Sequence, residues 1–168
     1  MATTLLEETL EGWRYTRDGV IAEFANIPAG SFDFVPAPGM RTVGQLAGHI
    51  VDWGFVMAGE LSRPDGNFTR QPVADFLREY SLDLARYPDK AALIDLLRRS
   101  HVEGEAKIRG AGERLMLQPI IQFNGQPATR LSWMSHHVAH EEYHRGQVAV
   151  CARLLGLVPA LTKMIHGS

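Results

Sequence analysis

The chain has 168 residues, of which 45% are hydrophobic and 21% are charged, a composition typical of a globular protein rather than of a disordered or membrane-embedded one. Its 17 basic and 19 acidic residues give a formal net charge of -2, and no cationic block is present to neutralise the phosphates of nucleic acid. We therefore expect one domain over residues 1–168 and no nucleic-acid partner.

Neither the N-terminus nor the apolar segments predict export or membrane insertion. Residues 1–8 lack the basic and long apolar regions of a signal peptide. No apolar run approaches the roughly 18 to 20 residues that cross a bilayer. The single cysteine, Cys151, cannot form an intramolecular disulfide. The expected location is the cytoplasm, without membrane association.

Hydrophobic periodicity predicts four long amphipathic helices, because apolar residues recur at spacings of three, four and seven. Thr42 is a good N-cap for the second helix, and Gly110-Ala111-Gly112 is expected to end the third. The helices are expected at about residues 4–27, 42–62, 89–109 and 129–155.

The connections between these helices are rich in proline and glycine. Residues 28–41 are expected to be irregular, and residues 72–80 to form a short helix, since Pro72 suits a first turn. Residues 115–130 favour an extended crossover or short hairpin with a trace of strand, and the tail after residue 155 has little pattern. The predicted fold class is all-α, a four-helix bundle with long crossover connections.

Four histidines of the last helix, His136, His137, His140 and His144, lie within nine residues. His140 and His144 are one turn apart on the same face, so both imidazoles can reach one metal ion. This face continues as an apolar stripe that must point into the core, where buried imidazoles need partners. A solvated pair, or one satisfied within the core, is the alternative. The stripe consists of Trp133, His137, His140, His144, Val148, Cys151 and Leu155.

A third ligand would have to come from another helix, and His49 is the natural candidate. It lies in the second helix beside the apolar residues Leu46, Ile50 and Trp53, and the small residues just before it would let helices approach closely. From the residues alone, a core histidine bonded to a carbonyl is the simpler interpretation of His49.

Two segments resemble the DinB/YfiT-like superfamily of four-helix bundles. Residues 36–50 are similar to the start of the family's second helix, and residues 140–147 are similar to its C-terminal signature, His-x-x-x-His-Arg-Gly-Gln. Their order and separation also agree over nearly the whole chain. The family binds a metal with one histidine of the second helix and two of the signature. The resemblance therefore implies His49, His140 and His144 as ligands.

The same residues also spell the zincin protease motif His-Glu-x-x-His, in which Glu141 would be a general base. A zincin needs a third ligand downstream, but the only histidine after His144 is His166, and residues 145–168 contain no Asp or Glu. The metzincin extension requires glycine where the chain has Gln147. We therefore expect Glu141 and Glu142 on the polar face of the helix, from which either could orient a ligand imidazole.

Other residues near the motif have weaker claims. His136 and His137 are candidates for a fourth ligand, a proton shuttle or residues that contact the ligand imidazoles, although a role without metal chemistry is favoured for both. His101 is expected at the surface. Cys151 is interpreted as a small core residue. Trp53, Trp133 and Tyr143 are interpreted as packing residues, and Arg145 as either a signature residue or a solvated one. The candidates for contact with the ligand imidazoles are His137, Glu141, Arg145 and Gln147.

Three neutral histidines leave a metal ion its full charge and at least one open position, as in catalytic sites. Zinc or nickel is expected first, and iron, manganese and copper also accept imidazole ligands. The resemblance implies a thiol S-transferase that activates a low-molecular-weight thiol against a small electrophile, and it also implies a homodimer. The alternatives are a non-catalytic metal- or ligand-binding module and, third, a metal-dependent hydrolase.

Overall fold

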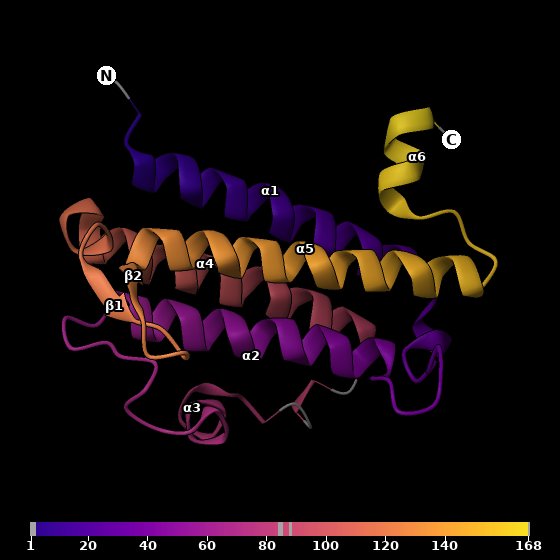
Figure 1. The fold of residues 1–168 in the computed structure, drawn as a ribbon. Helices are drawn as coiled ribbons and strands as arrows, with labels where there is room; N and C mark the ends of the chain where they lie inside the picture. The colour runs from indigo at the N-terminus through magenta and orange to yellow at the C-terminus, as the bar shows by residue number, and fades with distance from the viewer. Residues whose placement is uncertain (1–2, 84–85, 88, 168) are drawn as a thin grey trace.

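Four long helices form a bundle in the computed structural model, which describes residues 3–83, 86–87 and 89–167. Figure 1 shows α5 at the front between α1 and α2, with α4 behind, and α2 packs mainly on α4 while α1 packs mainly on α5. The predicted four-helix bundle is confirmed. The long helices are α1 (Leu5–Asn26), α2 (Val43–Ser62), α4 (Lys90–Met116) and α5 (Arg130–Leu154).

Each long helix begins at a residue whose side chain accepts a hydrogen bond from the first turn. Thr42 forms a capping box with Gln45, in which each side chain accepts from the other residue's backbone N–H. Such caps contribute about 1 kcal/mol each, which is why the predicted helix starts agree closely with the structure. The other three caps are Thr4, Asp89 and Thr129.

The connections contain the short helix and the hairpin that the sequence predicts, and also a 3-10 turn that it does not. The short helix α3 (Val73–Tyr80) lies outside the bundle against α2, and the 3-10 turn η1 (Ala29–Ser31) follows α1. Strands β1 (Pro119–Ile121) and β2 (Pro127–Thr129) pair antiparallel, with Ile120 opposite Ala128. The hairpin covers one end of the bundle, directly before α5 begins.

The third long helix breaks at the expected glycines, since Gly112 adopts the non-helical angles φ 79° and ψ 156°, and a short helical segment continues to Met116 beyond this kink. The expectation that the tail after residue 155 has little pattern is wrong. The C-terminal tail contains a further helix, α6 (Ala160–His166). The buried carboxylate of Glu23 in α1 accepts hydrogen bonds from the backbone N–H groups at the start of α6.

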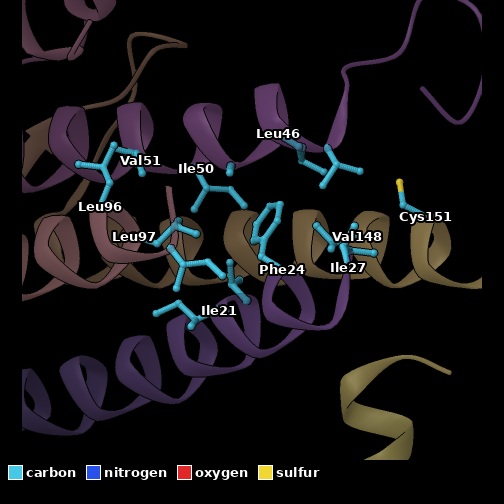
Figure 2. Close-up of a cluster of buried hydrophobic side chains, with 14 of the residues drawn as sticks. Ile21, Phe24, Ile27, Leu46, Ile50, Val51, Leu96, Leu97, Val148 and Cys151 are labelled. Carbon is cyan, nitrogen blue, oxygen red and sulfur yellow. The ribbon is translucent and has the colours of Figure 1, made fainter. Parts of the chain in front are cut away.

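The core consists of two apolar clusters along the bundle. Figure 2 shows one of them, in which Phe24 of α1, Ile50 of α2, Leu97 of α4 and Val148 of α5 converge. Cys151 is buried in this cluster, as expected for a small core residue. In the described part of the chain, none of the helices is long and apolar enough to span a membrane.

The close packing of α1 on α4 gives a stability prediction. A methyl group added at Gly104 would lie 2.6 Å from the Trp13 ring, so Gly104→Ala should lower the free energy of unfolding by about 1 to 3 kcal/mol. Gly110, on the same helix, has open space around it, and Gly110→Ala should raise stability by up to about 1 kcal/mol. Urea denaturation measures both, and equal stabilities for the two variants would contradict the observed packing.

Candidate metal centre

The packing of α2 on α5 brings three histidines together in the middle of the bundle. His49 comes from α2, and His140 and His144 come from successive turns of α5. One nitrogen from each ring lies within 4.8 Å of the others. The Nε2 atoms of His140 and His144 are 2.9 Å apart. The predicted pair and the predicted third histidine therefore meet at one point, and no carboxylate or thiol of the described residues joins them.

The surroundings favour the neutral form of these rings, which is the form that binds metals. Burial is the main cause that lowers the pKa of His49, to about 4, with smaller contributions from the charges of Arg41 and His144. Burial and the other histidines lower the pKa of His140 to about 3. The pKa of His144 is lowered for the same main reason. At neutral pH each ring therefore presents a lone pair.

Gln147 fixes the orientation of His144. The Nδ1–H of His144 donates a 2.8 Å hydrogen bond to Oε1 of Gln147, one turn further along α5. Since Nδ1 carries the proton, the lone pair of neutral His144 is on Nε2, the atom that faces His140. Metal-ligating histidines characteristically donate their other N–H to such a partner. The donor set fits a divalent metal, and Gln147 lies where it can orient His144.

We expected Glu141 on the polar face of α5, but it is fully buried against α1. Its carboxylate accepts hydrogen bonds from Trp13 Nε1 at 2.8 Å and Arg17 Nε at 2.8 Å. Burial by itself raises the pKa of Glu141, but the charge and hydrogen bonds of Arg17, together with a contact from His137, hold the pKa far below its usual range. Glu141 is thus a structural anion, which agrees with the rejection of the zincin interpretation.

Arg17 is the residue that sequence reasoning missed at this place. Besides Glu141, its guanidinium donates to the backbone carbonyl of Leu97 at 2.8 Å and to Ser100 Oγ at 3.1 Å, both on α4. A signal is present in the sequence, because Arg17 lies four residues after Trp13 and three before Val20 and so falls in the buried stripe of α1. One side chain therefore links α1, α4 and α5 directly behind the histidines.

The neighbouring histidines have different surroundings. His137 is buried, its ring stacks on His140 with centroids 6.4 Å apart, and its Nε2 lies 3.1 Å from a Glu141 oxygen. His101 is buried against the Trp13 ring, so the expected surface position is wrong. The exposed His136 packs on Trp133. None of these rings belongs to the three-histidine cluster.

Arg145 and Tyr143, the sequence neighbours of His144, have different surroundings. Arg145 is buried rather than solvated, lies against Gly19 of α1, and donates to Glu142 at 3.0 Å. Tyr143 is 65% exposed, although its ring touches that of His144 with centroids 5.2 Å apart. Of the four residues predicted to contact the ligand imidazoles, Gln147 bonds a ligand and His137 stacks on one.

Two cavities flank the histidines. A cavity of about 220 Å³ includes His140 in its wall and is lined by Trp53, Met57, Trp133, His136, His137 and His140. A cavity of about 450 Å³ includes Gln147 and Arg41 in its wall and is lined by Pro36, Gly39, Met40, Arg41, Leu46, Gln147 and Cys151. The smaller cavity reaches the cluster at His140, whereas none of the three histidines lines the larger one.

The fold and the site define a helical bundle with a central three-histidine cluster, and comparison places it in a family. The sequence model of the DinB superfamily matches residues 13–148. The chain belongs to the DinB superfamily. No curated protein sequence matches the chain.

Solved structures have the same fold at low sequence identity. A DinB-like protein from Bacillus subtilis, YjoA, is 15% identical with a TM-score of 0.68, and the match covers 89% of this chain and 92% of that one. YfiT from Bacillus subtilis, described as a probable metal-dependent hydrolase with an unusual four-helix bundle topology, is 14% identical with a TM-score of 0.69, covering 94% and 91%. A mycothiol-dependent maleylpyruvate isomerase is 13% identical with a TM-score of 0.66, covering 88% of this chain and 63% of that one.

The buried ion pair predicts a contrast between two adjacent glutamates. Glu141→Gln removes the charge that neutralises the buried Arg17 and should lower the free energy of unfolding by about 3 to 5 kcal/mol. Glu142→Gln removes a partly exposed partner of Arg145 and should cost at most about 1 kcal/mol. Urea denaturation of the metal-free proteins measures both changes. A loss below about 1 kcal/mol for Glu141→Gln would contradict a structural role for the pair.

The hydrogen bond from His144 predicts an effect on metal affinity. Gln147→Ala leaves the three ligand rings in place but removes the acceptor that orients His144, so zinc affinity should fall by about 10- to 100-fold. Competition with a chromophoric chelator measures this affinity. Gln126→Ala, in the hairpin, is the matched control and should keep the wild-type affinity. Unchanged zinc affinity in Gln147→Ala would show that this bond does not support the site.

Proposed function

We propose that this protein binds one divalent metal ion through His49, His140 and His144 and is a metal-dependent thiol S-transferase. The observation that carries the proposal is the meeting of three neutral imidazoles at one point, with no carboxylate among the described residues beside them. A zinc or nickel ion held in this way keeps its full positive charge and lowers the pKa of a thiol that reaches it.

The chain's own residues then have separate tasks. The three rings hold the site, and Gln147 keeps the His144 lone pair aimed at its centre. The low-molecular-weight thiol loses its proton to solvent, and its sulfur attacks a carbon of the electrophile. A carbon–sulfur bond forms as the leaving group departs. No protein cysteine is needed, which agrees with the burial of Cys151 and with the raised pKa that burial gives its thiol.

A metal-dependent hydrolase is the second candidate, and the description of YfiT favours it. Hydrolysis by bound water commonly uses a nearby carboxylate as a general base. Glu141, the nearest acidic residue in the signature, is committed to Arg17 and Trp13 instead. The structural similarity to the mycothiol-dependent isomerase adds support for a thiol substrate. A binding module without turnover is now the third candidate.

Arg41 provides a reason to expect an anionic thiol. Its side chain is exposed, lines the larger cavity, and forms no ion pair with any described residue. Its charge reaches His49 and His144, where it lowers the pKa of both rings. An unpaired guanidinium beside the site attracts carboxylates and can bind them through two parallel hydrogen bonds.

The proposal predicts thiol transfer that depends on the ligand histidines. Zinc- or nickel-loaded protein should conjugate bacillithiol, mycothiol or glutathione to iodoacetamide faster than the uncatalysed reaction. The rate of His144→Ala should be more than about tenfold lower, since removing a metal ligand reduces activity at least as much as removing a group that orients a ligand. His166→Ala, on α6, is the control and should retain the wild-type rate. The measurement is thiol consumption with time.

The other candidates predict different results in the same experiment. Hydrolysis of an ester or amide without added thiol, and no conjugation, would favour the hydrolase. Stoichiometric metal without either activity would favour the binding module.

The role of Arg41 predicts selectivity between thiols. Arg41→Ala should raise KM for glutathione by about 3- to 10-fold, because a charge-assisted contact is lost at an exposed position. KM for uncharged 2-mercaptoethanol should stay unchanged. Arg98→Ala, an exposed arginine on α4 that lines neither cavity beside the histidines, should change neither value. An equal rise for both thiols in Arg41→Ala would contradict carboxylate recognition by Arg41.

A further inference from the structure

The smaller cavity beside the histidines has apolar walls. It lies between α2, which contributes Trp53 and Met57, and α5, which contributes Trp133 and His140. Ring centroids of Trp53 and His140 are 6.0 Å apart, so a molecule in this cavity lies next to the candidate metal site. No Asp, Glu, Lys or Arg lines it. The cavity therefore suits an uncharged group.

Aromatic packing holds the walls of the cavity in place. Phe123, in the hairpin, contacts Trp53 and Trp133 with centroids 6.0 Å from each ring, and Phe68 contacts both Phe123 and Trp133. Phe123 thus packs against both tryptophans, and Phe68 packs against Trp133 as well. A ligand would meet a preformed site and would not have to order these side chains.

Three buried polar atoms of the lining residues form no hydrogen bond with any described residue. They are Nε1 of Trp133 and both ring nitrogens of His137, of which Nε2 lies 3.1 Å from a Glu141 oxygen. Buried polar atoms without partners are uncommon in proteins and need an explanation. A hydroxyl group on a bound ring can accept from an indole N–H or donate to an imidazole nitrogen.

We infer that the cavity bounded by Trp53, Met57 and Trp133 is the binding site for a single uncharged aromatic ring, which belongs to the electrophilic substrate. Its volume of about 220 Å³ exceeds the ~150 Å³ of an apolar protein cavity that binds benzene. Indole walls favour offset or edge-to-face contacts with such a ring. The inference rests on the proposed thiol transfer, for which it specifies aryl or benzyl electrophiles as the substrate class.

The test is binding of p-cresol to the zinc-loaded protein without any thiol, by isothermal titration calorimetry. The wild type should bind saturably, and Met57→Leu, which keeps the side-chain volume, should bind with an affinity within about threefold of it. Met57→Trp should bind at least tenfold more weakly, because the larger indole fills the cavity. Circular dichroism and zinc content verify the fold and the metal site. Absence of saturable binding to the wild type, or equal binding to a folded Met57→Trp variant, would overturn the inference.

A second measurement avoids dependence on the folding of Met57→Trp. In the wild type, p-cresol should shift the NMR signal of the Met57 methyl group through its ring current, and the signal is assigned by its loss in Met57→Leu. An unshifted Met57 signal at saturating p-cresol would overturn the inference. Thiol transfer to iodoacetamide without p-cresol binding would reject the ring site alone, whereas p-cresol binding without thiol transfer would reject the proposed function alone.

Discussion

The buried ion pair between Arg17 and Glu141 is the interaction on which the arrangement of the histidines depends. Glu141 lies in the bundle interior without solvent, and a carboxylate there must be paired and hydrogen-bonded to remain charged. Arg17 and Trp13 supply that pairing from α1. Because successive residues of a helix point about 100° apart, anchoring Glu141 to α1 turns His140 toward α2 and His49. The ion pair thus fixes the rotation of α5 that brings His140 and His144 to His49.

The same constraint explains the close approach of the helices around Arg17. A Cβ at Gly54 of α2 would lie 3.3 Å from an Arg17 nitrogen, so the small residue leaves room for the guanidinium between the helices. Trp13 belongs to one apolar cluster and Val20 to the other, so Arg17 lies between the two clusters along α1, and Figure 2 shows the cluster that contains Val20. The three histidines are neutral because burial and nearby positive charge disfavour their protonated forms. The buried contacts of Arg17 and Glu141 therefore support both the helix packing and the candidate metal site.

The sequence predicts the long helices and the His140/His144 pair because both are local patterns, read from spacings within a few turns. It does not predict the place of Glu141, because a charged residue is exposed by default and its partner Arg17 is 124 residues away. The helix α6 was missed for a similar reason, since its N-terminus is capped by distant Glu23. The choice of His49 as the third ligand depended on the family resemblance. The cavity between Trp53 and Trp133 arises only when α2, α5 and the hairpin pack together.

In the proposed site, three side chains share a single physical task, which is to present neutral nitrogen atoms to one divalent ion from two packed helices. The proposed thiol activation depends on that ion. The most direct test is elemental analysis of the purified wild type and of the His49→Ala, His140→Ala and His144→Ala variants, with circular dichroism to verify folding. We predict one zinc or nickel ion per wild-type chain and loss of stoichiometric metal in each folded variant. Stoichiometric metal in folded His140→Ala and His144→Ala proteins would contradict the account.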